Sequence, residues 1–387
     1  MQILCQRFVK TWLAAAILGL VVLAGLNVLV DPAGAYPRAH LKAFDSVRYL
    51  GLNRVTKAEM ARRGDWEIII LGSSRAELGF PAAHPFLTTN KACNLSLAAA
   101  RFPELVAAFD FACAHNPLKH VLLGLDLYMF SQGERWVDTF PESRFNPDVA
   151  VFPYYCKQLI GRAATDRTWE TIRRKLQGYR PIPQETRGFH NHTLGPGDSQ
   201  HEMFDRVMRF EGRGYQGQSV DPSYLELFRH VVRVCRDQHI DLQVAIMPVH
   251  ALDLELVYEG GRWPELEKWK QDLVEVLADE GTEGKFNLWD FTGYSWPTTE
   301  AVPSAGDRTN RMKFYFEGSH LTPALGGMVL DEMLANSSPH QFGVKLTRAN
   351  VREHLARILE DRAAYARTNA SDIQWVQGIM AGTPKQP

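Results

Sequence analysis

The chain has 387 residues, of which 43 are Lys or Arg and 44 are Asp or Glu, so its formal net charge is -1. Hydrophobic residues make up 45% of the sequence, which is typical of a folded globular protein and excludes a disordered or polytopic membrane chain. The balanced charge argues against binding to nucleic acid, which needs a basic surface. The length allows one large domain with insertions or two smaller domains.

The N-terminal segment has an unusual composition. Residues 12–30 contain no charged side chain and are about long enough to cross a bilayer. Arg7 and Lys10 precede this run and Asp31 follows it, so the positive-inside rule predicts residues 1–11 in the cytoplasm. We therefore expect a single-pass protein of the cytoplasmic membrane whose main domain is periplasmic or otherwise extracytoplasmic. The alternative is a cleaved signal peptide, for which Ala33-Gly34-Ala35 offers a weak cleavage site.

The rest of the chain alternates between predicted strands and helices. We interpret residues 31–63 as a connector and residues 128–221, rich in aromatic residues, Arg, Pro and Gly, as a large insertion. Short apolar runs predict strands at 66–71, 121–127, 242–247 and 286–291, and helical spacing predicts helices at 102–114, 224–239, 263–278, 323–334 and 351–365. This alternation predicts an α/β fold with a parallel sheet covered on both faces.

Polar residues follow the ends of four predicted strands. Ser74, Asp126, His250 and Asp290 each come at or shortly after the end of such a strand. In parallel sheets the functional groups gather beyond the carboxyl ends of the strands. The sequence therefore predicts a functional site at this edge.

Two short blocks resemble those of a known enzyme superfamily. Residues 69–75 (IILGSSR) resemble the first block of SGNH, or GDSL-like, hydrolases, with Ser74 in the place of the nucleophile. The preceding serine stands where the family usually has an Asp. Residues 315–323 (YFEGSHLTP) are similar to the last block, Asp-x-x-His, with Glu317 matching the acid and His320 matching the base.

The resemblance covers about residues 67–334 and carries several implications. It implies a three-layer α/β/α, flavodoxin-like domain at 64–340. The helix predicted at 351–365 lies beyond this domain and indicates a helical extension at 341–387. Membrane-anchored proteins of similar layout, of the alginate O-acetylation and DltD-like kind, take part in acylating or deacylating cell-surface polysaccharide. The resemblance thus implies a polysaccharide acyl ester as substrate and a membrane acyl-transfer partner.

The residue types suit nucleophilic catalysis. A serine hydroxyl such as that of Ser74 becomes reactive when a neutral imidazole accepts its proton. The imidazole of His320 would need an acceptor on its other nitrogen, which Glu317 can supply. The alternatives are that Ser74 caps a helix and that the other two residues belong to a surface turn. Together, on an α/β frame, the three residues favour a catalytic triad.

The sequence departs from the SGNH pattern at the oxyanion hole. The family uses a Gly in its second block and an Asn in its third. The second block here, residues 94–98, has no Gly, and Asp126 stands where Asn is expected. An ionised Asp cannot donate a hydrogen bond to an oxyanion. Three outcomes are open: Asn94 supplies the donor, Asp126 is protonated or has another role such as orienting Arg75, or hydrolytic activity is lost.

Histidines offer further candidates. His250 is placed to line a substrate cleft, although a structural role is the alternative. His190, His192 and His201 lie in the insertion near Glu202, but no acid or Cys completes a convincing zinc set. We therefore expect neither metal nor cofactor. Aromatic residues of the insertion are candidates for sugar stacking, although core packing explains them more simply: Trp136, Tyr154, Tyr155 and Tyr179.

The sequence thus predicts a membrane-anchored serine esterase or O-acyltransferase. Which of the two reactions occurs depends on whether water or a sugar hydroxyl accepts the acyl group. The rival prediction is a non-catalytic scaffold or polysaccharide-binding subunit on a decayed SGNH frame. Its basis is the departure at Asn94 and Asp126.

Overall fold

The computed structural model describes residues 2–50, 53–133, 136–137, 139–180, 187–190, 192–195, 197–215, 219–281, 285–335 and 339–382. The chain divides into two compact units. The anchor unit comprises residues 1–64 and 138–188, and the sheet unit comprises residues 65–137 and 189–387. The segment interpreted as a connector therefore folds together with residues 138–188, the middle of the expected insertion, whereas both ends of that insertion, residues 128–137 and 189–221, fold with the sheet.

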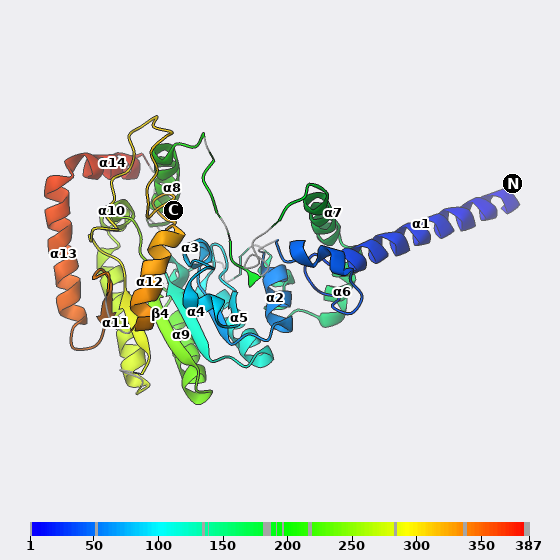
Figure 1. Ribbon diagram of the computed structural model, residues 1–387, viewed down its shortest axis with the longest axis horizontal. Coiled ribbons are helices and arrows are strands. Elements are labelled where there is room, and N and C mark those ends of the chain that lie inside the picture. The colour runs from blue at the N-terminus through cyan, green and yellow to red at the C-terminus, as the bar shows by residue number, and fades with distance from the viewer. Residues whose placement is uncertain are drawn as a thin grey trace. The chain divides into compact units, whose positions relative to one another are not determined.

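The anchor unit is helical in its described part. Its helices are α1 (Gln2–Val30), η1 (Lys42–Val47), α2 (Arg54–Arg63), η3 (Phe140–Glu142), α6 (Val151–Ile160) and α7 (Arg162–Leu176). Residues Cys5–Val30 of α1 form a helix long and apolar enough to cross a membrane, as the sequence predicts. Helices α6 and α7 both pack against α1 (Figure 1). Two of the candidates for sugar stacking belong to a small hydrophobic core in this unit. Tyr154 is buried in that core, and Tyr155 is partly buried and packs against it.

Side chains tie the C-terminal end of α1 into the anchor unit. The last carbonyls of a helix lack partners within the helix. The guanidinium of Arg48 donates to the carbonyl oxygens of Val30 at 3.2 Å and Asp31 at 2.8 Å. Asn27, on the last full turn, donates from Nδ2 to the Leu159 carbonyl at 2.8 Å. The end of the apolar helix is thus fixed to the domain by hydrogen bonds as well as by packing.

The sheet unit is built on six strands. They are β1 (Ile68–Leu71), β2 (Ala92–Asn94), β3 (His120–Leu125), β4 (Asp241–Ile246), β5 (Asn287–Asp290) and β6 (Val344–Leu346), in the order β2-β1-β3-β4-β5-β6. The first five are parallel, but β6 pairs antiparallel with β5, which corrects the expectation of a purely parallel sheet. Strand β6 is the edge strand and pairs with β5 alone, and an antiparallel edge strand on an otherwise parallel sheet is common in α/β proteins.

The helices of the sheet unit pack in three groups. In chain order they are α3 (Ser74–Gly79), α4 (Pro85–Thr88), α5 (Phe102–His115), η2 (Leu127–Phe130), α8 (Gln200–Tyr215), α9 (Ser223–Asp237), α10 (Ala251–Glu259), α11 (Trp263–Asp279), α12 (Pro323–Ala335), α13 (Val351–Thr368) and α14 (Ala370–Ala381). Helices α5, α9, α11 and α13 form one row, α12 packs on α3, and α8, α10 and α14 pack on one another. The protein is thus an α/β protein with a mostly parallel, mixed sheet.

One close contact fixes the helix that carries Ser74. A Cβ atom at Gly326 of α12 would overlap the backbone carbonyl of Gly79 at the end of α3. Glycine therefore allows α12 to approach α3 more closely than any other residue would. This contact holds the short α3 helix in place at the carboxyl end of β1.

Candidate active site

Ser74 lies where β1 ends and α3 begins. The four residues of β1 are fully buried, and the chain turns at Gly72 directly into α3. Ser73, not Ser74, caps the helix, because its Oγ accepts a hydrogen bond from the backbone N–H of Arg75 at 3.1 Å. The helix-cap alternative for Ser74 is therefore filled by its neighbour, and the Ser74 hydroxyl is directed to another partner.

That partner belongs to a tight turn between β5 and α12. Tyr315 and Leu321 form an isolated antiparallel bridge, and the N–H of Phe316 donates to the His320 carbonyl at 2.9 Å. The turn closes with a hydrogen bond from the His320 N–H to the Glu317 carbonyl at 3.2 Å. Glu317 and His320 thus occupy the two ends of one β-turn, which brings their side chains to the same side.

The three residues form a continuous hydrogen-bonded chain. His320 Nε2 lies 2.7 Å from Ser74 Oγ, and the opposite ring nitrogen, Nδ1, contacts the Glu317 carboxylate. The second carboxylate oxygen accepts the Ser319 N–H at 2.8 Å. Glu317 is only 4% exposed, whereas Ser74 and His320 are half-buried. The Ser74 hydroxyl and the His320 ring are therefore partly accessible from solvent, while the Glu317 carboxylate is enclosed.

The electrostatics favour an ionised Glu317. Burial alone would raise the pKa of this carboxyl, but its hydrogen bond to His320, the charge of that ring and the Ser319 N–H together lower the pKa below its ordinary value. A carboxylate on Nδ1 fixes the ring tautomer that leaves Nε2 free to accept a proton from Ser74. The arrangement can therefore generate a serine nucleophile.

Arg75, the residue after the serine, joins the surrounding elements. It is 3% exposed, and its Nη1 pairs with Asp126 at 2.7 Å, just after β3. Its Nε and Nη2 donate to the carbonyl and hydroxyl of Ser319 at 3.0 and 3.1 Å. Nη2 also reaches Asp253 of α10 at 3.3 Å and Glu211 of α8 at 3.4 Å. One guanidinium thus holds the turn that carries the acid and base against the nucleophile's own helix.

One of the carboxyl groups around Arg75 has a raised pKa. Burial raises the pKa of Asp253 well above its ordinary value, and the adjacent Glu211 raises it further, although Arg75 acts in the opposite direction. A protonated Asp253 can donate a hydrogen bond to Glu211 and reduces the repulsion between the two. Tyr128 completes the surroundings, with its ring centroid 5.7 Å from the guanidinium carbon.

The two oxyanion candidates have structural partners. Asn94 is fully buried, donates from Nδ2 to the Ala76 carbonyl at 3.2 Å and accepts the Ser96 N–H at 3.0 Å. Asp126 accepts the Ser73 hydroxyl at 2.6 Å in addition to pairing with Arg75. Of the three outcomes left open by the sequence, this geometry matches the one in which Asp126 orients Arg75.

His250 does not line a cleft, contrary to expectation. Its ring is buried, and it caps α10 by accepting the Leu252 N–H on Nδ1 at 3.3 Å. Its other nitrogen lies 2.7 Å from the Glu300 carbonyl. Burial lowers the pKa of His250 to about 4. Both ring nitrogens are therefore occupied, and the residue serves as a neutral helix cap.

Asp290, at the end of β5, belongs to a buried ion cluster. Its carboxylate lies 2.7 Å from Lys270 Nζ and 2.9 Å from His354 Nε2, and it also accepts the Thr292 hydroxyl. Burial alone would raise the pKa of Asp290, but these two basic neighbours lower it below its ordinary value. Asp290 therefore has a structural role at the end of β5, because its ion pairs link this strand to α11 and α13.

His192, one of the insertion histidines, lies beside the turn. Its ring contacts Phe316, the residue before Glu317, edge-on at 4.6 Å between centroids. Burial lowers the pKa of His192, and the neighbouring His190 and His320 lower it further. His201 instead stacks on Trp375 at 4.3 Å. In the described part of the chain, no group of three or more His, Cys, Asp or Glu is arranged to hold a metal ion.

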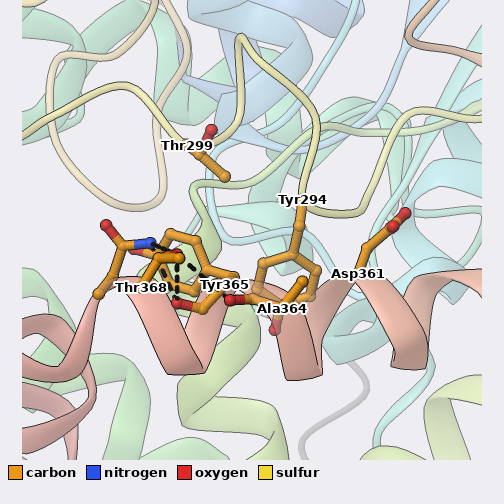
Figure 2. Close-up of a pocket in the computed structure, with 7 residues that line it drawn as sticks. Tyr294, Thr299, Asp361, Ala364, Tyr365 and Thr368 are labelled. Carbon is orange, nitrogen blue, oxygen red and sulfur yellow. Dashed lines mark hydrogen bonds between the residues drawn. The ribbon is translucent and has the colours of Figure 1, made fainter.

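A separate pocket of about 340 Å³ lies between the loop after β5 and α13 (Figure 2). Tyr294 and Tyr365 form its walls, and their hydroxyls are hydrogen-bonded to Glu255 and Asp372 at 2.7 and 2.6 Å. None of its lining residues belongs to the triad. We assign the candidate active site to the triad because the reactive groups are there.

Several residues that position the triad were not predicted from the sequence. Gln200, at the start of α8, donates to the carbonyls of Tyr315 and Phe316 and accepts the Met312 N–H, so it braces the loop before the turn. Glu211 lies about three turns further along nearly the same face of this helix. The apolar pairs at 203–204 and 207–208, four residues apart, have the helical spacing that could have revealed this helix within the expected insertion.

A comparison with known protein families and with curated proteins finds no match to this sequence.

Proposed function

We propose that the protein is a membrane-anchored serine esterase or O-acyltransferase with an SGNH-type, three-layer α/β/α domain. The observation that carries this proposal is the hydrogen-bonded chain Ser74–His320–Glu317, formed by residues almost 250 positions apart. A serine, a histidine and a carboxylate brought together in this order are the groups that acyl transfer requires.

The sheet topology supports the same proposal. The order of the five parallel strands, 2-1-3-4-5, is that of flavodoxin-like doubly wound sheets. In these sheets ligands bind at the point where the strand order reverses, here between the carboxyl ends of β1 and β3. Ser74 follows β1 and Asp126 follows β3. The nucleophile therefore occupies the position at which such sheets bind their ligands.

The proposed reaction has two halves. The Ser74 Oγ attacks the acyl carbonyl carbon while His320 Nε2 takes the hydroxyl proton, and this proton is then given to the departing alcohol, leaving an acyl-serine. Water or a sugar hydroxyl next attacks the acyl carbon and gives its proton to the same nitrogen. Cleavage of the acyl–serine bond returns that proton to Ser74. Glu317 orients the ring throughout and stabilises its charged form.

The substrate class rests on the resemblance to anchored SGNH proteins. It favours an acyl ester of a cell-surface polysaccharide, with a membrane protein as acyl donor or acceptor partner. An active site on a domain tethered by α1 would have access to substrates close to the membrane.

A fluorophosphonate probe tests the proposal, because it labels only an activated serine. We expect labelling of the full-length protein in detergent, and its loss in both Ser74→Ala and His320→Ala. Ser304→Ala is the matched control, because Ser304 is an exposed loop serine in the same unit. Absence of labelling in folded wild-type protein would favour a non-catalytic, polysaccharide-binding scaffold.

A further inference from the structure

Helices α6 and α7 expose large apolar side chains. Phe152, Trp169 and Leu176 are 79%, 67% and 80% exposed, and Ile160 is also exposed. Isolated exposed apolar residues are common, but several on one pair of adjacent helices indicate a surface that contacts something apolar. Neither helix belongs to the candidate active site, so catalysis does not explain this exposure.

The position of these helices along α1 indicates what they contact. Residues 5–15 of α1 are exposed, and side chains become partly or fully covered mainly from Leu23 onward, with Asn27 and Val30 buried. Helices α6 and α7 provide that cover, and Figure 1 shows them beside the end of α1 that is remote from the N-terminus. Leu23 to Val30 corresponds to about 10 Å of helix, which is the depth to which interfacial helices enter a bilayer.

The charge of the anchor unit agrees with a membrane surface. This unit holds 18 Lys and Arg against 9 Asp and Glu, whereas the sheet unit holds 25 against 35. On α7, the exposed Arg162, Arg173 and Lys175 flank Trp169 along the helix. Basic residues around an interfacial Trp are typical of helices that lie on anionic phospholipid.

We propose that α6 and α7 lie on the membrane surface where α1 emerges, with Phe152, Trp169 and Leu176 inserted among the lipids. Their basic side chains bind the anionic headgroups. Two observations favour lipid over a protein partner: the apolar surface is continuous with a membrane-spanning helix, and the excess of positive charge is confined to this unit. The protein would then contact the bilayer through a span and two surface helices. This inference depends on α1 spanning the membrane and not on the proposed catalysis.

Quenching by brominated lipid tests the contact. The full chain is reconstituted in vesicles of phosphatidylcholine and phosphatidylglycerol with bromine on the acyl chains, and tryptophan fluorescence is compared with that in unbrominated vesicles. We expect Trp169→Phe to remove part of the quenched signal, because Trp169 contacts acyl chains. Trp296→Phe is the matched control, because Trp296 is a similarly exposed tryptophan in the sheet unit, and it should leave the quenched signal unchanged.

A second variant tests the binding of the basic side chains of α7 to anionic headgroups. Combined Arg162→Gln, Arg173→Gln and Lys175→Gln should reduce the contribution of Trp169 to quenching by roughly half or more, and the reduction should disappear in vesicles without phosphatidylglycerol. Arg352→Gln with Arg357→Gln on α13 is the control. Equal quenching of wild type and Trp169→Phe would show that Trp169 does not contact acyl chains and would overturn the proposal.

Discussion

Ser74 and Arg75 are adjacent in sequence but have different tasks. The serine hydroxyl contacts His320, while the arginine reaches past it to the backbone and side chain of Ser319, between the acid and the base. Because both side chains leave the same turn of α3, any movement of that helix shifts the nucleophile and the brace together. Arg75 is therefore a positioning residue that keeps Ser74 and His320 in register.

Replacing Arg75 by Lys tests this role. A lysine keeps the positive charge, but its single nitrogen cannot bind Asp126 and both Ser319 oxygens at once. A misplacement of about 1 Å at a reacting group can lower a rate about 100-fold. We expect the rate constant for covalent fluorophosphonate labelling of Arg75→Lys to fall by about that factor. The binding constant of the probe should change little, measured well below the melting temperature.

The same variant should also be less stable, because it leaves buried carboxyl groups without their full set of partners. Arg357→Lys, an exposed substitution on α13, is the control and should change neither property. If Arg75→Lys labelled at the wild-type rate, the triad would be held by the turn alone.

The residues of the site differ in how far sequence could reveal them. Ser74, Glu317 and His320 lie in short blocks with recognisable order, so their association could be predicted. Glu211 and Asp253 could not be predicted, because each is one acidic residue on an ordinary helix. They reach Arg75 only because α8 and α10 pack together, and such packing has no local sequence signal.

The helices and strands that the sequence could predict are those that are long enough and buried enough to show an apolar pattern. The predicted strands at 66–71, 121–127, 242–247 and 286–291 are present as β1, β3, β4 and β5, since each is a buried apolar run. Strands β2 and β6 have three residues each, too few to show a period. Helix α8 lies inside the expected insertion, and α14 lies in the expected C-terminal extension, beyond the helix predicted at 351–365. Tertiary contacts, rather than local propensity, define β2 and β6.

Helix α10 depends on a buried neutral histidine, which makes the stability of the sheet unit pH-dependent. Burial depresses the pKa of His250 from 6.5 to about 4. Between these values the unfolded chain binds a proton that the folded chain does not, so stability present above pH 6.5 is lost as the pH falls toward 4. The depression corresponds to about 3 kcal/mol.

His250→Asn should flatten this dependence, because Asn can cap the helix without titrating. We expect the unfolding free energy of wild type to decrease relative to that of the variant as the pH falls from 6.5 to 4, as measured by urea denaturation. His239→Asn is the matched control: His239 is exposed and has φ of +57°, a conformation that Asn tolerates. Parallel curves for wild type and His250→Asn would contradict the assignment of this pH dependence to His250.

At the scale of the whole molecule, each unit is assembled from separate stretches of sequence. The anchor unit joins the N-terminal segment to residues 138–188, which the chain enters only after three strands of the sheet are complete. Composition identified both stretches as different from the sheet, but it could not show that they fold together. Their shared features are the excess of positive charge and the packing around the end of α1.

This assembly bears on whether α1 is retained or removed as a signal peptide. The only cleavage site suggested by the sequence, residues 33–35, lies in the core of the anchor unit, where Ala33 and Ala35 are 2% and 5% exposed. Cleavage there would also remove Asn27 from its hydrogen bonds with α6 and α7. We therefore expect the mature protein to keep its first 35 residues, as measured by intact mass, and to remain in the membrane pellet after alkaline carbonate extraction. A mature chain that begins at Tyr36 and is released by carbonate would show that α1 is only a leader, and the anchor unit would then have to fold without the helix around which it is built.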